Sequence, residues 1–159
     1  MNHNALKNVL LFIGCLILCQ AAGGLGTIAT IPNIPTWYAS LHKPFFNPPN
    51  WIFGPVWTIL YTLISLSLYL TLRASHPDRS KALNLFFLQL ALNIIWSFLF
   101  FQYHLLLISL VEIILMLGTI IAFTVVSYRI NKTASYCFLP YVAWVSFATL
   151  LNASILYLN

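Results

Sequence analysis

Charged side chains are the scarcest component of this sequence. Its 159 residues include only seven Lys and Arg and two Asp and Glu, so 6% are charged while 61% are hydrophobic. Soluble domains carry about 25% charged residues, so this chain cannot cover a surface that faces water, and lipid must be its main solvent. The net charge of +5 therefore does not indicate a nucleic-acid partner, and the positions of Lys and Arg carry the information instead.

Residues for familiar catalytic or metal chemistry are also scarce. The three cysteines lie inside apolar runs and form no CxxC pair, so we expect buried helix residues rather than a disulfide framework. No P-loop, Rossmann glycine pattern or HExxH motif occurs. The four histidines lie at ends or in expected loops, so we expect no metal site and no required cofactor; they are His3, His42, His76 and His104.

Long apolar runs dominate what is present. A membrane-spanning helix needs about 20 mostly apolar residues, and five stretches meet this length, at about residues 5–27, 51–73, 82–101, 105–128 and 134–158. The runs do not alternate as barrel strands do, and helices satisfy their own backbone in lipid. The sequence therefore predicts an all-α membrane protein, with residues 1–159 forming one five-helix bundle and a structured first loop over residues 32–50.

The basic residues predict an orientation. Six of the seven lie at the start of the first span or at the second and fourth links, namely Lys7, Arg73, Arg79, Lys81, Arg129 and Lys132, and only Lys43 lies on the other side. By the positive-inside rule, the N-terminus faces the inside and the first loop faces out. Because the number of spans is odd, the C-terminal end at Asn159 is expected outside.

The first loop combines stiffness with aromatic bulk. Pro44, Pro48 and Pro49 fix the backbone and restrict the residues before them. Trp37 and Trp51 flank them with apolar area suited to interfacial depth. Two interpretations stay open: an aromatic belt with a tight turn, or a lid over a pocket between helices.

Polar residues within the apolar runs are expected to face protein rather than lipid. Two helical faces collect them with aromatics: Gln89, Asn93, Trp96 and Phe100 in the third span, and Tyr141, Trp144, Ala148 and Asn152 in the fifth. These faces indicate either interhelical hydrogen bonds or a pocket lined by Trp, Asn and Tyr. Glu112 is the only carboxylate within a span. Without a second acid it makes no proton relay, and we expect a structural hydrogen bond or a polar helix contact.

Three motifs resemble a known family in order and spacing. The stretch WYASLHKPFFNPPNWIFGPVWTILY at residues 37–61 resembles the signature of the TspO/MBR family of tryptophan-rich sensory and translocator proteins. QLALNIIW at residues 89–96 and PYVAWVSFATLLN at residues 140–152 are similar to its third-helix and fifth-helix motifs. The resemblance covers nearly the whole chain.

This resemblance implies a dimeric five-helix bundle that binds porphyrins, haem-related tetrapyrroles and drug-like aromatics in a cavity, with the first loop as its lid. The ligand-binding positions that match the family are Trp51, Phe53, Trp57, Asn93, Trp96, Tyr141, Trp144, Ala148 and Asn152, and the lid residues Trp37 and Pro44 are expected to join them. Some bacterial members are reported to break porphyrin down in light, and the tryptophans implicated match Trp51 and Trp144. No other catalytic residue is predicted.

The resemblance does not decide whether a bound ligand is sensed, degraded or transported. A porphyrin receptor or sensor is the first hypothesis, a light- and oxygen-dependent porphyrin-degrading enzyme the second, and a porphyrin or sterol transporter the third. The proposed cholesterol motif lacks its basic residue after Leu151 and Tyr157, which argues against cholesterol transport and favours a prokaryotic cell membrane. Val126, Tyr128 and Lys132 match the motif elsewhere, so a sterol stays among the candidate ligands beside the lipid bilayer.

Overall fold

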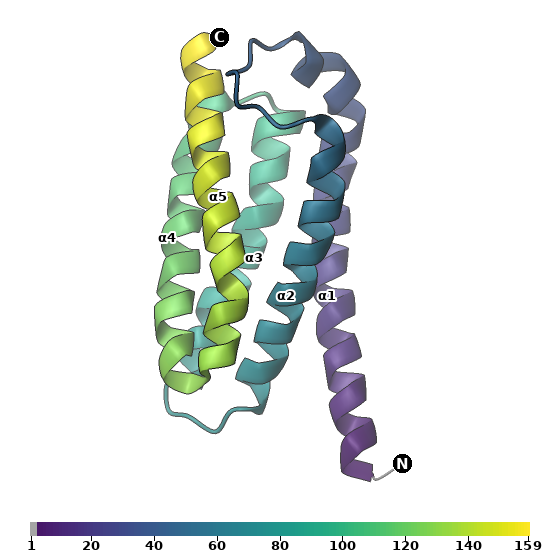
Figure 1. Ribbon diagram of the computed structural model, residues 1–159, viewed down its shortest axis with the longest axis vertical. Coiled ribbons are helices and arrows are strands. Elements are labelled where there is room, and N and C mark those ends of the chain that lie inside the picture. Colours follow the sequence, from purple (N-terminus) through teal and green to yellow (C-terminus); the bar gives the residue numbers. More distant parts are fainter. Residues whose placement is uncertain (1–2) are drawn as a thin grey trace.

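The structure, a computed structural model, describes residues 3–159 and is an all-α bundle. Five long helices stand side by side in Figure 1. Their bounds are α1 His3–Asn33, α2 Phe53–Arg73, α3 Arg79–Ser97, α4 Leu106–Ile130 and α5 Lys132–Leu158. All five helices are long and apolar enough to cross a membrane, as predicted, and the two ends of the chain lie at opposite ends of the bundle.

The helices close into a ring in the order α1, α2, α5, α4, α3. Helix α1 packs on α2 and α3, α2 packs on α5, and α4 packs on both α3 and α5. The link at residues 103–105 and the single residue Asn131 are so short that α4 packs antiparallel to α3 and α5, its neighbours in sequence. The link at residues 74–78 instead connects α2 to α3 across the end of the bundle, because α5 lies between α2 and α4 in the ring.

The half of the bundle away from the first loop is solidly packed. The rings of Phe86, Phe123 and Phe138 meet there with centroid distances of 4.2 to 6.0 Å, and all three residues are fully buried. The Ser67 hydroxyl donates to the Ala134 carbonyl at 2.8 Å and joins α2 to α5. Close contact of aromatic and aliphatic groups holds this half together, because lipid supplies no hydrophobic drive between helices.

The first helix runs further than the sequence predicted. Its end was expected near residue 27, but α1 continues to Asn33 and passes into the π-helical turn Ile34–Tyr38. The predicted loop over residues 32–50 is therefore corrected. Its non-helical part spans residues 41–49, which we call the lid, and the short 3₁₀ turn Asn50–Ile52 leads into α2.

Lipid explains why the helix does not stop at its glycines and prolines. Every backbone polar group must find a partner inside the protein at this depth, so remaining helical is the favoured solution. Side chains add hydrogen bonds where prolines disturb the backbone: Asn33 donates to the Ala29 carbonyl at 2.8 Å, and Thr36 donates to the Pro32 carbonyl at 3.1 Å. π-helical turns are rare and occur mostly as single turns within α-helices, which is how this one continues α1.

Candidate functional site

A cavity of about 440 Å³ occupies the half of the bundle nearest the lid. All five helices contribute to its lining, and its volume lies within the range of about 300–1,000 Å³ that is usual for small-molecule sites. Six of the lining residues are exposed: Gly24, Thr27 and Ile31 of α1, Asn50 in the turn before α2, and Gly54 and Thr58 of α2. The cavity therefore reaches the surface of the bundle between these two helices.

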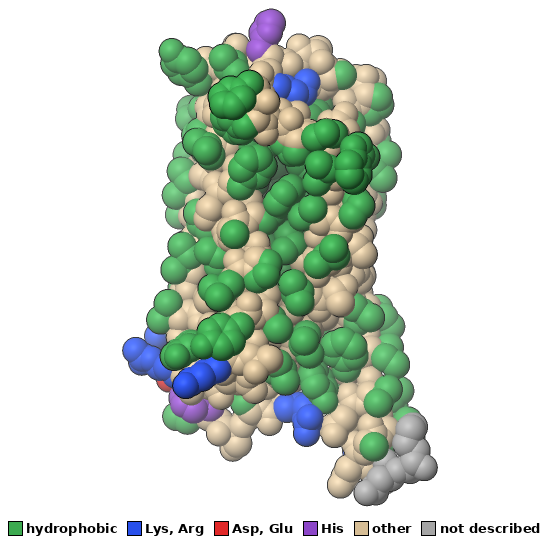
Figure 2. Space-filling model, viewed as in Figure 1, with side chains coloured by type: hydrophobic (Ala, Val, Ile, Leu, Met, Phe, Trp, Pro, Cys, Tyr) green, Lys and Arg blue, Asp and Glu red, His purple; other side chains and the backbone are tan. Residues whose placement is uncertain are grey.

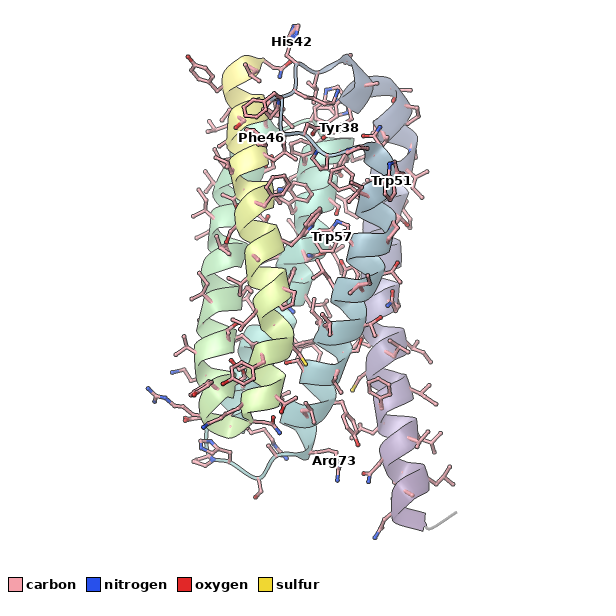
Figure 3. The ribbon with its side chains drawn as sticks, in the orientation of Figure 1. Tyr38, His42, Phe46, Trp51, Trp57 and Arg73 are labelled. Carbon is pink, nitrogen blue, oxygen red and sulfur yellow. The ribbon has the colours of Figure 1, made fainter. Side chains whose placement is uncertain are left out.

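Aromatic rings form the walls of this cavity. Trp144 of α5 meets Phe53 of α2 edge to face, with ring centroids 6.0 Å apart. On the opposite wall, Trp96 of α3 stacks on Phe100 at 5.1 Å. Trp57 of α2 lies deeper and contacts the Tyr61 ring at 5.5 Å, and Figure 3 shows it below the lid within the bundle. Flat walls of this kind suit a flat aromatic ligand.

A chain of hydrogen bonds forms the polar part of the cavity. The Tyr61 hydroxyl donates to Asn93 Oδ1, and Asn93 Nδ2 donates to the Tyr141 hydroxyl at 2.8 Å. Nearer the lid, Trp96 Nε1 donates to Asn152 Oδ1 at 3.2 Å, and Asn152 Nδ2 donates to the Leu106 carbonyl at the same distance. These bonds connect α2, α3, α4 and α5 around the cavity and fix its shape.

The lining carries no Asp, Glu, Lys, Arg or His within the described part of the chain. Burying an unpaired charge in such surroundings costs far more than burying a paired one, so the cavity favours ligand surface that is uncharged. The end of the cavity beneath the lid, which Tyr38 lines, is called its mouth here. Charged substituents of a ligand are expected at this mouth, because the ammonium group of Lys43 lies nearby, 4.8 Å from the centre of the Tyr38 ring.

The lid is attached to both sides of the bundle. On the α1 side, the buried Tyr38 hydroxyl donates to Asn47 Oδ1 at 2.7 Å. On the α5 side, the Phe46 ring meets the Phe147 ring at 6.2 Å, and Phe147 in turn contacts Trp144 of the cavity wall at 5.7 Å. Figure 3 shows Tyr38 beneath the lid and Phe46 beside α5. The lid therefore rests directly on residues that shape the cavity.

Seven of the predicted ligand-binding residues line this cavity, namely Phe53, Trp57, Asn93, Trp96, Trp144, Ala148 and Asn152. The helical faces proposed for the third and fifth spans thus converge on one space. Whether these side chains bind a ligand stays a prediction.

Four predicted residues lie outside the lining. The Trp37 ring stacks on His104 at 4.1 Å and meets the ring of Phe100, a lining residue, at 5.4 Å. Pro44 lies in the lid at a shallow hollow against the end of α5. Tyr141 is fully buried and contacts the lining residues Asn93, through a hydrogen bond, and Trp57, whose ring lies 6.2 Å away.

Trp51 is the fourth predicted residue that lies outside the cavity lining. It is 74% exposed and points away from the cavity, beside the start of α2. The turn Asn50–Ile52 directs its side chain outward, while Asn50 before it and Phe53 after it line the cavity, and whether Trp51 contacts a ligand stays a prediction.

The largest contribution that the sequence did not reveal comes from α1. This helix lines one side with Gln20, Gly23, Gly24, Gly26, Thr27, Thr30 and Ile31. Gln20 was the available signal, because an amide within an apolar span is expected to face protein. Its Nε2 lies 3.2 Å from both the Thr58 carbonyl and the Thr62 hydroxyl oxygen and joins α1 to α2.

Glu112 and Gln89 are buried away from the lining. Glu112 was expected to make a structural hydrogen bond or a polar helix contact. Neither its carboxyl group nor the Gln89 amide has a hydrogen-bond partner among the described residues, so the expected hydrogen bond is not seen.

Comparison with known proteins places the chain in a family context. A model of the TspO/MBR family matches residues 15–158. The tryptophan-rich protein TspO of Archaeoglobus fulgidus is 41% identical over 152 residues, which cover 96% of this chain and 99% of that protein. The Homo sapiens translocator protein is 39% identical over 143 residues, 88% of this chain and 80% of its own. The tryptophan-rich sensory protein of Cereibacter sphaeroides is 32% identical over 145 residues, 91% and 90% of the two chains.

Proposed function

This chain belongs to the TspO/MBR family, and we propose that it is an integral membrane receptor or sensor that binds porphyrins in the cavity beneath its lid. Its five spans make it a multi-pass membrane protein. The single observation that carries the ligand class is the lining: aromatic walls, amides held in place by hydrogen bonds, and no charged side chain among the described residues.

A porphyrin fits this lining by its chemistry. Its macrocycle is flat, aromatic and uncharged, which suits the faces of Trp96 and Trp144, while fixed amides such as that of Asn152 orient it. A porphyrin with two propionate groups would direct these carboxylates toward the mouth, where Lys43 offers an ammonium group. The same arrangement accepts other flat ligands that carry their charge at one edge.

We further infer that the mouth of the cavity faces outward. The basic residues gather at the end opposite the lid, where Figure 2 shows Lys and Arg side chains, whereas Lys43 belongs to the lid. The positive-inside rule then directs the lid away from the inside. In spheroplasts, a membrane-impermeant maleimide should label His42→Cys and leave Ser75→Cys unlabelled. The reverse pattern would overturn this orientation.

Truncation of one cavity wall tests the ligand assignment. We expect Trp144→Ala to weaken protoporphyrin IX binding about tenfold or more, which corresponds to about 1.4 kcal/mol, because the variant loses a ring that faces the cavity and its contact with Phe53. Binding is followed in the dark through the porphyrin absorbance band, since removing a tryptophan changes the fluorescence signal. Thermal unfolding in detergent checks that the variant is folded.

Two further truncations make the result interpretable. Phe87→Ala removes an aromatic ring from the lipid-facing side of α3, where 47% of the residue is exposed, and should leave affinity unchanged. Trp51 was predicted from the sequence to bind the ligand, but it does not line the cavity. We therefore expect Trp51→Ala to change the affinity for protoporphyrin IX less than threefold. Equal losses for Trp51→Ala and Trp144→Ala, or unchanged binding by Trp144→Ala, would contradict the proposed cavity.

A further inference from the structure

We propose that Asn159 is a latch that holds the lid closed and thereby sets how fast a ligand enters and leaves the cavity. The proposal rests on the proposed function insofar as the ligand is a porphyrin, but the latch itself can be measured without any porphyrin. It concerns a side chain at the end of α5 that lies outside the cavity lining.

The geometry of Asn159 is that of a two-point clamp. Its Oδ1 accepts a hydrogen bond from the His42 backbone amide at 3.0 Å, and its Nδ2 donates to the His42 carbonyl at 3.0 Å. One side-chain amide thus pairs with both polar groups of one lid residue, as a neighbouring strand would. The second Nδ2 hydrogen is used as well, because Nδ2 also donates to the Ile155 carbonyl at 2.9 Å.

Only asparagine meets all these demands with a side chain of this length. The His42 amide needs an acceptor, the His42 carbonyl needs a donor, and the Ile155 carbonyl at the end of α5 needs a second donor. Aspartate has the same shape but no donor when ionised, so it would keep at most the bond from the His42 amide. Alanine would lose all three. The chemistry of this position therefore separates a latch from a residue that merely fills space.

The position of the clamp determines what it can control. The bond from Tyr38 to Asn47 ties the lid to the α1 side, and the hydrogen bonds of Lys43 go to carbonyls of Ala39 and Leu41 close by in sequence. Within residues 3–159, the two bonds between His42 and Asn159 are the hydrogen bonds that join the lid to α5. Figure 3 shows His42 at the tip of the bundle, above Tyr38 and Phe46.

The lid is suited to move as a unit when the clamp breaks. Pro44, Pro48 and Pro49 stiffen it, and His42 and Asn159 are both exposed, so water can replace their bonds at modest cost. The contacts to α5 that remain are apolar: the Phe46 ring lies on Phe147, and Leu41 and Phe46 pack against the cluster that contains Leu151 and Ile155. Release of Asn159 would thus free the α5 side of the lid while the Tyr38 side acts as the hinge.

The rate of lid opening is measured without porphyrin by a cysteine placed in the cavity. Ala148→Cys lines the cavity, and in lipid nanodiscs a charged maleimide can reach it only from the aqueous side. We expect Asn159→Ala and Asn159→Asp to raise its labelling rate about tenfold, the effect of losing hydrogen bonds of ordinary net strength. The chain without Ala148→Cys gives the background from the native cysteines.

Matched substitutions at Asn84 provide the control. This residue is exposed on α3, in the first turns after the link at the end opposite the lid. Asn84→Ala and Asn84→Asp make the same chemical changes away from the lid and should leave the labelling rate unchanged. Thermal unfolding shows whether the Asn159 variants still fold, since the bond to Ile155 also completes the end of α5.

Protoporphyrin IX then links the latch to exchange of the ligand. We expect its dissociation rate in the dark to rise by the same factor as the labelling rate in the Asn159 variants. If labelling accelerates while protoporphyrin IX binds to none of the proteins, the latch stands and the ligand assignment fails. An unchanged labelling rate in folded Asn159→Ala overturns the latch, whatever the porphyrin does.

Discussion

The contact between α1 and α2 at Gly23 gives the sharpest test of how the cavity is built. A Cβ atom at this position would lie 2.5 and 2.8 Å from carbons of the Tyr61 ring. At the next residue, Gly24, a Cβ would meet nothing within 4 Å. Gly23→Ala should therefore force two elements apart, while Gly24→Ala adds a methyl group to open space.

The ring of Tyr61 cannot yield without loss. It is 5% exposed, its hydroxyl donates to Asn93, and its face contacts Trp57. Inserting a methyl group against such a fixed neighbour costs about 1–3 kcal/mol. Both substitutions also gain up to about 1 kcal/mol of helix propensity. Because this gain is common to both, Gly23→Ala should be less stable than Gly24→Ala by about 1–3 kcal/mol.

The assay compares unfolding of the two variants and the parent chain in one detergent, followed by near-UV circular dichroism. Gly24→Ala is expected to equal or exceed the parent in stability. Since Tyr61 lines the cavity, Gly23→Ala should also weaken porphyrin binding. Equal stability of the two variants would refute the reasoning, because it would mean that the helices separate at Gly23 without cost.

Three further substitutions test single interactions. Lys43→Met should weaken binding of protoporphyrin IX several-fold and leave that of its dimethyl ester unchanged in spectral titrations, because the ester offers no carboxylate to the ammonium group at the mouth. Tyr61→Phe should lower the free energy of unfolding by about 1–3 kcal/mol, because Asn93 Oδ1 then stays buried without the donor it has now; a loss below 0.5 kcal/mol would contradict this. Asn131→Ala should cost about 0.5–2 kcal/mol of stability, since Asn131 Oδ1 accepts from the Ala134 amide at the start of α5, whereas Asn131→Ser should recover most of the loss.

The sequence predicted the helices well because membrane thickness sets a length that any apolar run reveals. It predicted the end of α1 poorly, because the residues that normally end a helix do not end it here. Gly and Pro terminate helices in water, where freed backbone groups find solvent, but lipid offers no such partner. The glycines of α1 serve packing instead: Gly23 faces Tyr61 and Gly26 faces Ser97.

Three small residues spaced one helical turn apart form a ridge on α1, namely Cys15, Cys19 and Gly23. Small residues let helices approach closely, either within one subunit or between subunits. The two cysteines are buried inside the chain, and Gly23 contacts Tyr61, so the ridge acts within the subunit. The expected homodimer stays a prediction and must use another face.

The sequence predicted the direction of site residues that lie within regular helices, but not of residues that lie outside them. Residues of α3 and α5 are separated by whole helical turns, so Asn93, Trp96, Trp144 and Asn152 could be assigned to inner faces from spacing. Trp51 lies in a 3₁₀ turn before α2, and no periodicity within α2 fixes the direction of such a residue. This outward position matters for the degrading-enzyme hypothesis, which relied on Trp51 and Trp144 together.

The distribution of packing along the bundle bears on whether a ligand passes through the protein. Near the lid, small residues such as Gly23 and Ala148 leave a cavity, whereas toward the opposite end Phe86, Phe123 and Phe138 fill the space between helices. Carrying a rigid macrocycle across would require these three buried rings to separate, with the loss of most of their contacts. Opening the lid breaks two exposed hydrogen bonds and the apolar contacts of lid residues such as Phe46 with the end of α5. A ligand that enters beneath the lid therefore leaves more readily by the same side or between α1 and α2, and this asymmetry favours a receptor or sensor over a transmembrane carrier.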